Sequence, residues 1–156
     1  MEFKEGVKIM LDKLGESKIM ALASCVDDYP MVRNISALIY DQCIWFKTDR
    51  NFRKTRQLVE NPHVALCWNG VQVEGIAEIK GLVVDEPGRV FEKKYKELLW
   101  GSYNRYSHEE DEILVCVKPH FVELWDEDED RNAFQIFLDF DHETIEYKPY
   151  DDKDRS

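Results

Sequence analysis

The sequence predicts a mainly β fold, an antiparallel β-barrel with flanking helices. Short apolar runs of strand length recur along the 156 residues, whereas helical periodicity is confined to three segments. Most of these runs are joined by connections too short for the crossover helix that parallel strands need. About six strands with tight turns favour a small barrel, because closure removes exposed sheet edges. We expect a single domain over residues 1–147 and a loose tail over 148–156.

The first third of the chain predicts one helix and three strands. Residues 2–14 form an amphipathic helix, and Gly15 ends it. The apolar side chains at helical spacing are Phe3, Val7, Met10, Leu11 and Leu14. Apolar runs over residues 18–26, 31–40 and 43–48 predict strands, joined by short turns rich in Asp.

The middle of the chain predicts a short helix followed by a hairpin. Residues 51–60 form the helix, with Asn51 as its N-cap and an Asn-Pro pair after its last residue. Residues 63–68 and 71–84 form two strands around Asn69-Gly70, a strong hairpin signal.

The C-terminal third predicts a helix, a loop and a long strand. Residues 89–99 form a charged amphipathic helix, and residues 100–111 form a polar loop. Residues 113–125 form a strand in which Pro119 indicates an edge position or a bulge. An extra strand or hairpin is expected over residues 133–147.

Charge and composition exclude several classes of function. The net charge of −11 argues against nucleic-acid binding and against anionic membranes. No apolar run approaches the roughly 20 residues that span a bilayer, and the first residues lack the apolar core of a secretory signal. Four dispersed cysteines are expected to be free thiols in a reducing cytoplasm. Histidine and acidic spacings predict no metal site.

A basic cluster is the most informative local feature of this acidic chain. Only Asp49 opposes five basic residues over positions 47–56, which are Lys47, Arg50, Arg53, Lys54 and Arg56. Basic side chains in a first helical turn oppose the helix dipole, while the turn itself favours an anion. A bound phosphate would account for the cluster. A solvated basic face is an equally compatible interpretation.

A further basic residue, Arg33, interrupts the apolar strand over residues 31–40. Because residues two apart share a strand face, Arg33 lies with Ile35 and Ala37, while Asn34 and Ser36 lie on the opposite face. This pattern is compatible with an arginine at a wet cavity in the mouth of a barrel. It is also compatible with an arginine at a strand edge whose charged end reaches solvent.

Three segments together resemble the FMN-binding segment of the pyridoxamine 5′-phosphate oxidase-like family. They are RNISAL (33–38), FKTDRNFRKT (46–55) and QLVENPHVALCW (57–68). They reproduce an Arg-bearing strand, an aromatic-x-Thr strand end, a Lys-bearing helix, an Asn-Pro turn and a further strand. The resemblance implies a Greek-key-like split barrel with FMN at the two-fold interface of a homodimer.

The same resemblance implies roles for individual residues. Arg33 and Lys54 would hold the FMN phosphate with Arg53 beside it, and Lys47 and Thr48 would lie along the ribityl chain. The backbone of Asn34, Ile35 and Ser36 would face the isoalloxazine ring, and Gln72 would make a further contact. No catalytic residue is implied, because the flavin carries the redox chemistry.

The chain departs from the true oxidase at two places. Leu38 stands where the oxidase has a substrate-binding lysine, and no Arg-x-His element follows near the C-terminus. The acidic segment 126–130 would also repel a phosphorylated substrate. We therefore expect an FMN-dependent oxidoreductase that reduces a small electron-poor compound with a reduced nicotinamide, similar to nitroimidazole and flavin reductases. The alternative is a non-enzymatic protein that stores or senses a flavin or haem.

Overall fold

The computed structural model describes residues 1–150, which form one antiparallel sheet of eight strands and four helices. In chain order the elements are α1 (Phe3–Leu14), β1 (Ser17–Val26), β2 (Tyr29–Tyr40), β3 (Cys43–Asp49), α2 (Arg53–Glu60), β4 (His63–Trp68), β5 (Val71–Leu82), α3 (Glu86–Leu98), α4 (Trp100–Tyr106), β6 (Glu112–Glu127), β7 (Ala133–Asp139) and β8 (Thr144–Pro149). No helix among these residues is long and apolar enough to cross a membrane.

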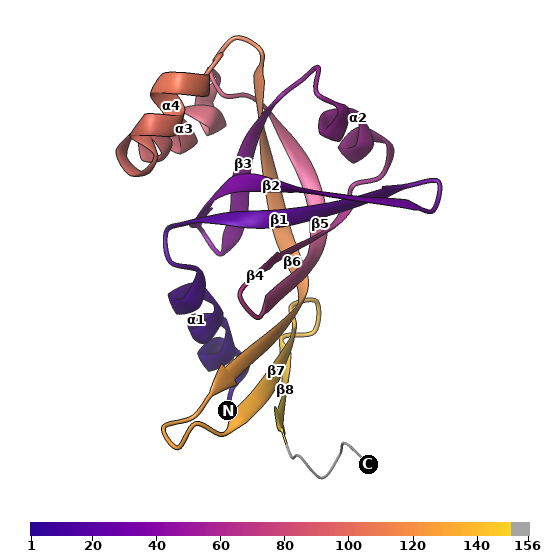
Figure 1. Ribbon diagram of the computed structural model, residues 1–156, viewed down its shortest axis with the longest axis vertical. Helices are drawn as coiled ribbons and strands as arrows, with labels where there is room; N and C mark the ends of the chain where they lie inside the picture. Colours follow the sequence, from indigo (N-terminus) through magenta and orange to yellow (C-terminus); the bar gives the residue numbers. More distant parts are fainter. Residues whose placement is uncertain (151–156) are drawn as a thin grey trace.

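Six of the strands close into a barrel. Their order is β3-β2-β1-β4-β5-β6, and pairing between β3 and β6 completes the circle. β6 then continues beyond the barrel and pairs with β7, which pairs with β8 (Figure 1). The mainly β prediction with flanking helices is confirmed, and the closed barrel matches a split barrel.

Short turns set the register of the barrel. The turns 27–28, 41–42 and 69–70 each place both residues at positive φ, the geometry of two-residue hairpin turns.

Gly75 of β5 lies opposite Pro119 of β6 at an irregularity in the pairing. A Cβ at Gly75 would lie 2.5 Å from the carbonyl oxygen of Lys118, so only glycine allows this close approach. Pro119 therefore marks a bulge in a central strand and not a sheet edge.

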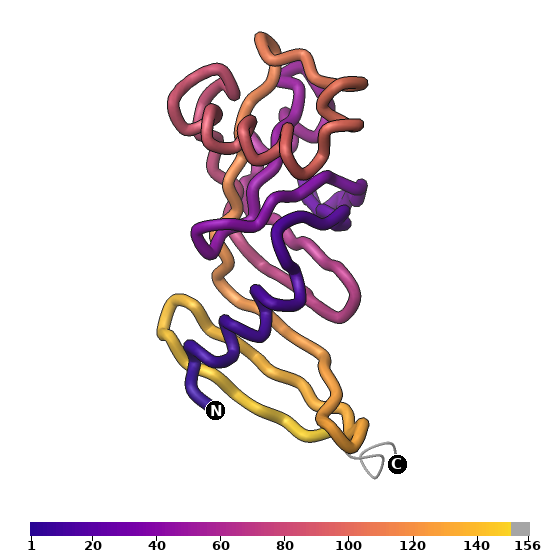
Figure 2. Tube along the Cα trace, turned by 90° about the vertical axis from the view of Figure 1, so that its left-hand side faces the viewer, coloured from indigo at the N-terminus to yellow at the C-terminus, as the bar shows by residue number. Residues whose placement is uncertain are grey.

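Two hydrophobic clusters fill the molecule. The larger lies inside the barrel and includes Met20, Leu22 and Phe46, with α1 packed against it. The smaller lies beneath α3, where Phe91 and Tyr95 pack on the outer side of the barrel. In Figure 2, α1 lies at the end that carries β7 and β8, and α3 and α4 lie at the opposite end. The two ends of the barrel are therefore covered by different elements.

The cap of helix α2 lies one residue later than predicted. The predicted N-cap, Asn51, instead donates its backbone N–H to Oδ1 of Asp49 at 2.8 Å, and Phe52 occupies the cap position. The side chain of Asp49 thus closes a turn ahead of the helix, because an Asp side chain readily accepts the N–H two residues on. Lys54 is consequently the second helical residue and not the third.

Three further boundaries differ from the prediction. Helix α4 occupies Trp100–Tyr106, where a polar loop was predicted, because Tyr103 packs against the cluster beneath α3 and Ser102 forms a hydrogen bond with Tyr95. Helix α3 begins at Glu86, because proline is tolerated in a first helical turn. Strand β8 includes Lys148 and Pro149, which the prediction assigned to the loose tail. The rest of that predicted tail, from 151 on, lies outside the described residues.

Candidate functional site

A gap between β2 and β3 exposes main-chain groups on one side of β2. Residues 38–40 of β2 pair with residues 43–45 of β3, and beyond them β3 pairs only with β6. The two-residue turns at both ends of β2 direct the N–H and C=O of its even-numbered residues away from β1. The main-chain groups of Asn34 and Ser36 therefore face the gap.

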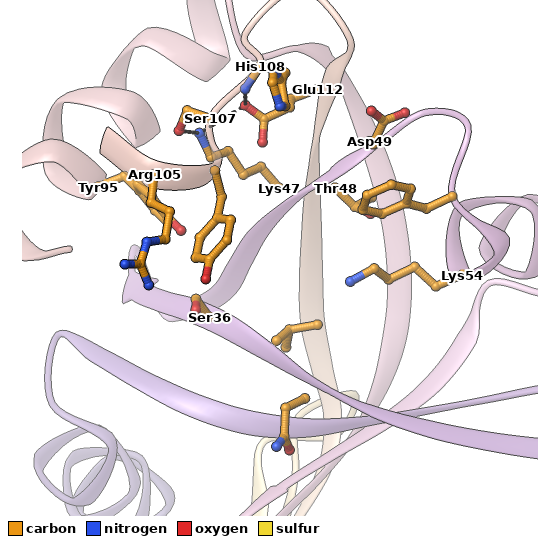
Figure 3. A pocket seen from close by; sticks show the side chains of 14 residues that line it. Ser36, Lys47, Thr48, Asp49, Lys54, Tyr95, Arg105, Ser107, His108 and Glu112 are labelled. Atoms are coloured by element: carbon orange, nitrogen blue, oxygen red, sulfur yellow. Dashed lines mark hydrogen bonds and ion pairs between the residues drawn. The ribbon is translucent and has the colours of Figure 1, made fainter. Parts of the chain in front are cut away.

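The gap opens into a cavity of about 430 Å³ (Figure 3). Residues 34–36 of β2 and Lys54 line one part of it. The other part is lined from above by Tyr95 of α3 and by Arg105 and Tyr106 of α4. The cavity thus brings together β2, the start of α2 and the α3–α4 pair, which are far apart in the sequence.

Three cations, Arg33, Arg53 and Lys54, gather at the start of α2, and Lys54 lines the end of this cavity. Lys54 also lines a neighbouring cavity of about 410 Å³, which Arg33 and Arg53 border. Burial and the charge of Arg53 lower the pKa of Arg33, and burial and the charge of Arg33 lower the pKa of Lys54. Over residues 1–150, no carboxylate lies within ion-pair distance of these three side chains. Uncompensated positive charge of this kind favours an anion.

Neutral oxygen atoms hold Arg33 in place. Its guanidinium donates to the Leu22 carbonyl at 3.2 Å and to Oγ of Ser24 at 2.9 Å, and it also donates to Oε1 of Gln57. Arg33 lies on the same strand face as Ile35, as strand alternation predicts. Its hydrogen bond to Gln57 of α2 directs the guanidinium toward that helix. Because its acceptors are uncharged, the arginine keeps its full charge for a ligand.

The first turn of α2 adds backbone donors to the same place. The N–H of Phe52 donates to the Asp49 carbonyl at 3.1 Å. The N–H groups of Arg53 and Lys54 have no backbone acceptor in the described part of the chain. Thr48 is buried at the side of the first cavity, just ahead of this turn. A helix N-terminus with three adjacent cations has the chemistry of a phosphate site.

Lys47 lies in the cavity wall but faces two carboxylates. Its side chain is 5% exposed, and its ammonium lies 2.8 Å from Oε1 of Glu92 and 3.1 Å from Oε1 of Glu112. It also donates to Oγ of Ser107 at 2.8 Å (Figure 3). The local sequence predicted Lys47 as part of the basic cluster, and nothing near it in the chain indicated these partners.

The two carboxylates around Lys47 differ in how they are held. Glu112 also accepts the backbone N–H of His108 at 2.9 Å. Glu92 is held only by its ion pair with Lys47, and its second carboxylate oxygen, Oε2, is buried with no hydrogen-bond donor among the described residues. Burial raises the pKa of Glu92, although the nearby Lys47 opposes the shift.

Gln72 is the one predicted site residue that lines neither of these two cavities. It is exposed on the outer face of the barrel, in a cavity of about 630 Å³ that Cys67 and Val32 also line. The prediction also missed the contribution of α4, whose Arg105 and Tyr106 line the site. The spacing of Trp100, Tyr103 and Tyr106 could have indicated this helix.

The closed six-stranded barrel and the gap beside β2 together define a split barrel. A family model described as pyridoxamine 5′-phosphate oxidase matches residues 8–126. The chain therefore belongs to the pyridoxamine 5′-phosphate oxidase-like family of flavin-binding proteins. No curated protein sequence matches the chain.

Solved structures of low sequence identity share the fold. A protein related to general stress protein 26 from Clostridium acetobutylicum is 15% identical with a TM-score of 0.64, and the match covers 92% of this chain and 100% of that chain. A pyridoxamine 5′-phosphate oxidase-related, FMN-binding protein from Nostoc punctiforme is 13% identical with a TM-score of 0.60, and the match covers 96% of each chain. An F420 reductase is 20% identical with a TM-score of 0.53, and the match covers 70% of this chain and 91% of that chain.

Proposed function

We propose that this protein binds FMN in the gap between β2 and β3 and works as an oxidoreductase. Its substrate would be a small electron-poor compound, and its electron donor a reduced nicotinamide. The observation that carries the proposal is the group of Arg33, Arg53 and Lys54 at the start of α2, which has no carboxylate partner in the described chain. The Nostoc punctiforme structure of the same fold is an FMN-binding protein, which supports this cofactor.

The residues of the cavity fit the two polar parts of FMN. The three cations and the free N–H groups of α2 suit a phosphate. The main-chain groups of Asn34 and Ser36 suit the polar edge of the isoalloxazine ring, which carries both donors and acceptors. FMN supplies the redox chemistry when bound, and these side chains hold and orient it. The Lys47 stem lines the space between, while its charge is neutralised by Glu92 and Glu112.

We further propose that the protein is a homodimer. Val32 is 69% exposed and Ile19 is 65% exposed on the outer face of the sheet, and small side chains such as Ala21 and Ala65 flatten the surface around them. Gln72 lies on this face, so it would lie in the interface between the two copies. An obligate dimer should bury more than about 2,000 Å² in total.

The alternative function is a non-enzymatic carrier or sensor that uses the same cavity. His108 lines the cavity, and imidazole is a common axial ligand of haem iron, so haem is one candidate ligand for this alternative. A deazaflavin is the other candidate ligand, because a chain of this fold is an F420 reductase.

The absorption spectrum of the purified protein tests the proposal. Oxidised-flavin bands that are retained through gel filtration, with FMN released on denaturation, would support it. Anaerobic bleaching by NADH or NADPH, followed by multiple turnovers when an electron-poor acceptor is added, would support the enzyme over the carrier. A haem Soret band, or no FMN binding in a titration of the colourless protein, would refute the proposed cofactor.

A further inference from the structure

Arg105 is an exposed cation at the cavity, on the side opposite Lys54. It lies near the end of α4 and lines the cavity together with Ser36 and Tyr106. In Figure 3, Arg105 and Lys54 enter the cavity from opposite sides. The cavity therefore has positive charge at two separate places, and a single phosphate group can account for only one of them.

The charge of Arg105 is left free even though carboxylates are close in the sequence. Glu109 lies 3.9 Å from Lys96, Asp111 lies 2.9 Å from Arg50, and Glu112 lies 3.1 Å from Lys47. Each of these acids is paired with another cation. Within residues 1–150, the only charge contact of Arg105 is with the ring of its neighbour Tyr106, whose centroid is 5.8 Å away.

The two exposed side chains offer a particular kind of binding surface. A guanidinium presents parallel N–H donors that match the two oxygens of a carboxylate. The ring of Tyr106, 64% exposed at the same mouth, offers a flat apolar surface beside it. A single guanidinium neutralises the one charge of a carboxylate, whereas the dianion of a phosphate monoester would keep one negative charge uncompensated at this place.

We propose that Arg105 and Tyr106 bind a planar aromatic carboxylic acid, with Arg105 pairing with the carboxylate and Tyr106 packing on the ring. In the proposed reaction, on which this assignment of the substrate rests, the electron-poor compound is therefore an aromatic acid. Arg105 is then a specificity-determining residue, because a neutral aromatic compound would leave its charge unpaired.

The test uses benzoate, its neutral analogue benzamide and the dianion phenyl phosphate. Binding of each is measured by calorimetry on the wild-type chain, with FMN and without it, and on Arg105→Gln and Arg105→Lys. Arg89→Gln is the matched control, because Arg89 pairs with Glu86 at 3.0 Å on α3 and does not line the cavity. Both glutamine variants change the net charge equally.

We expect benzoate to bind more tightly than either analogue, and Arg105→Gln to weaken benzoate by about 10- to 150-fold, the range for a charge-assisted hydrogen-bonded pair. Arg105→Lys should recover part of this loss, and Arg89→Gln should change nothing. Equal binding of benzoate and benzamide, tightest binding of phenyl phosphate, or an unchanged benzoate affinity in Arg105→Gln would overturn the proposal. The FMN titration separates the two hypotheses: failure to bind FMN refutes the proposed function, whereas the benzoate result on the cofactor-free chain decides the role of Arg105.

Discussion

Replacing Lys54 is expected to weaken FMN binding far more than replacing Arg56. Lys54 is half-buried between two cavities, and no carboxylate competes for its charge over the described residues. A charge-assisted bond to phosphate contributes about 1.5–3 kcal/mol, so Lys54→Ala should weaken binding by about 10- to 150-fold. Arg56 is exposed and lies about 200° further around the helix. Arg56→Ala should change affinity by less than about fivefold.

The same substitution should act in the opposite direction on the stability of the cofactor-free chain. Burial lowers the pKa of Lys54, so the unfolded chain holds this proton more tightly than the folded chain. Stability then rises with pH between the lowered pKa and the ordinary value of 10.5. Lys54→Ala removes the buried charge, so it should reduce this rise and should not lower the melting temperature near neutral pH.

Calorimetric titration of cofactor-free protein with FMN measures the affinities, and thermal melts with and without FMN measure the stabilities. Arg56→Ala is a close control, because it removes one positive charge from the same helix. Equal losses of affinity in the two variants would mean that the cluster is a solvated basic surface. An unchanged affinity in Lys54→Ala would place the phosphate elsewhere and refute the reasoning from the cavity.

Three other predictions concern stability and assembly. Glu92→Gln should become more stable relative to wild type as pH rises from 4.5 to neutral, as measured by denaturant titrations. The reason is that the raised pKa of Glu92 makes the folded wild type hold its proton to higher pH than the unfolded chain, so wild type loses stability over this range. If the stabilities of the variant and of wild type changed with pH in parallel, this would be refuted. Gly88→Ala should cost about 1–3 kcal/mol in the same titrations, since its Cβ would lie 2.3 Å from Cα of Val83, whereas Gly101→Ala meets no atom within 4 Å and should be neutral or stabilising; equal effects would contradict this. Val32→Glu, at an exposed position of the proposed dimer face, should halve the mass seen by light scattering while circular dichroism stays unchanged, and a wild-type monomer at micromolar concentration would refute the dimer.

Most strands were predictable because the signals that define a strand, an apolar run and the turn residues at its ends, lie within a few residues of one another. Apolar runs ended at pairs of residues such as Asp27-Asp28 and Asn69-Gly70, which adopt the positive φ that tight hairpins need. The position of Arg33 on the face of Ile35 followed from strand alternation. The start of α2 was predicted less well, because Asn51 is a good capping residue by type, whereas in the folded turn its N–H is bound to Asp49 and Phe52 occupies the cap position.

The site was predictable only in part, because long-range contacts decide where charged side chains point. The basic residues around Lys54 formed a cluster in the sequence, and Arg53 and Lys54 do come together with Arg33. Lys47 belonged to the same cluster, yet the fold pairs it with Glu92 and Glu112, which lie 45 and 65 positions away in the chain. No local pattern reports such a pair.

Local sequence was sufficient to predict an antiparallel barrel and to locate a basic cluster at one helix, because strand alternation, turn geometry and charge spacing act over a few residues. The folded chain was needed to place α4 over the cavity and to leave Arg105 without a carboxylate. Three of the four acidic residues that follow it in the sequence, Glu109, Asp111 and Glu112, pair instead with Lys96, Arg50 and Lys47. The reason is physical: the charge that a side chain presents to a ligand depends on every group the fold brings within a few ångströms, and strand pairing in a barrel selects those groups from distant parts of the chain.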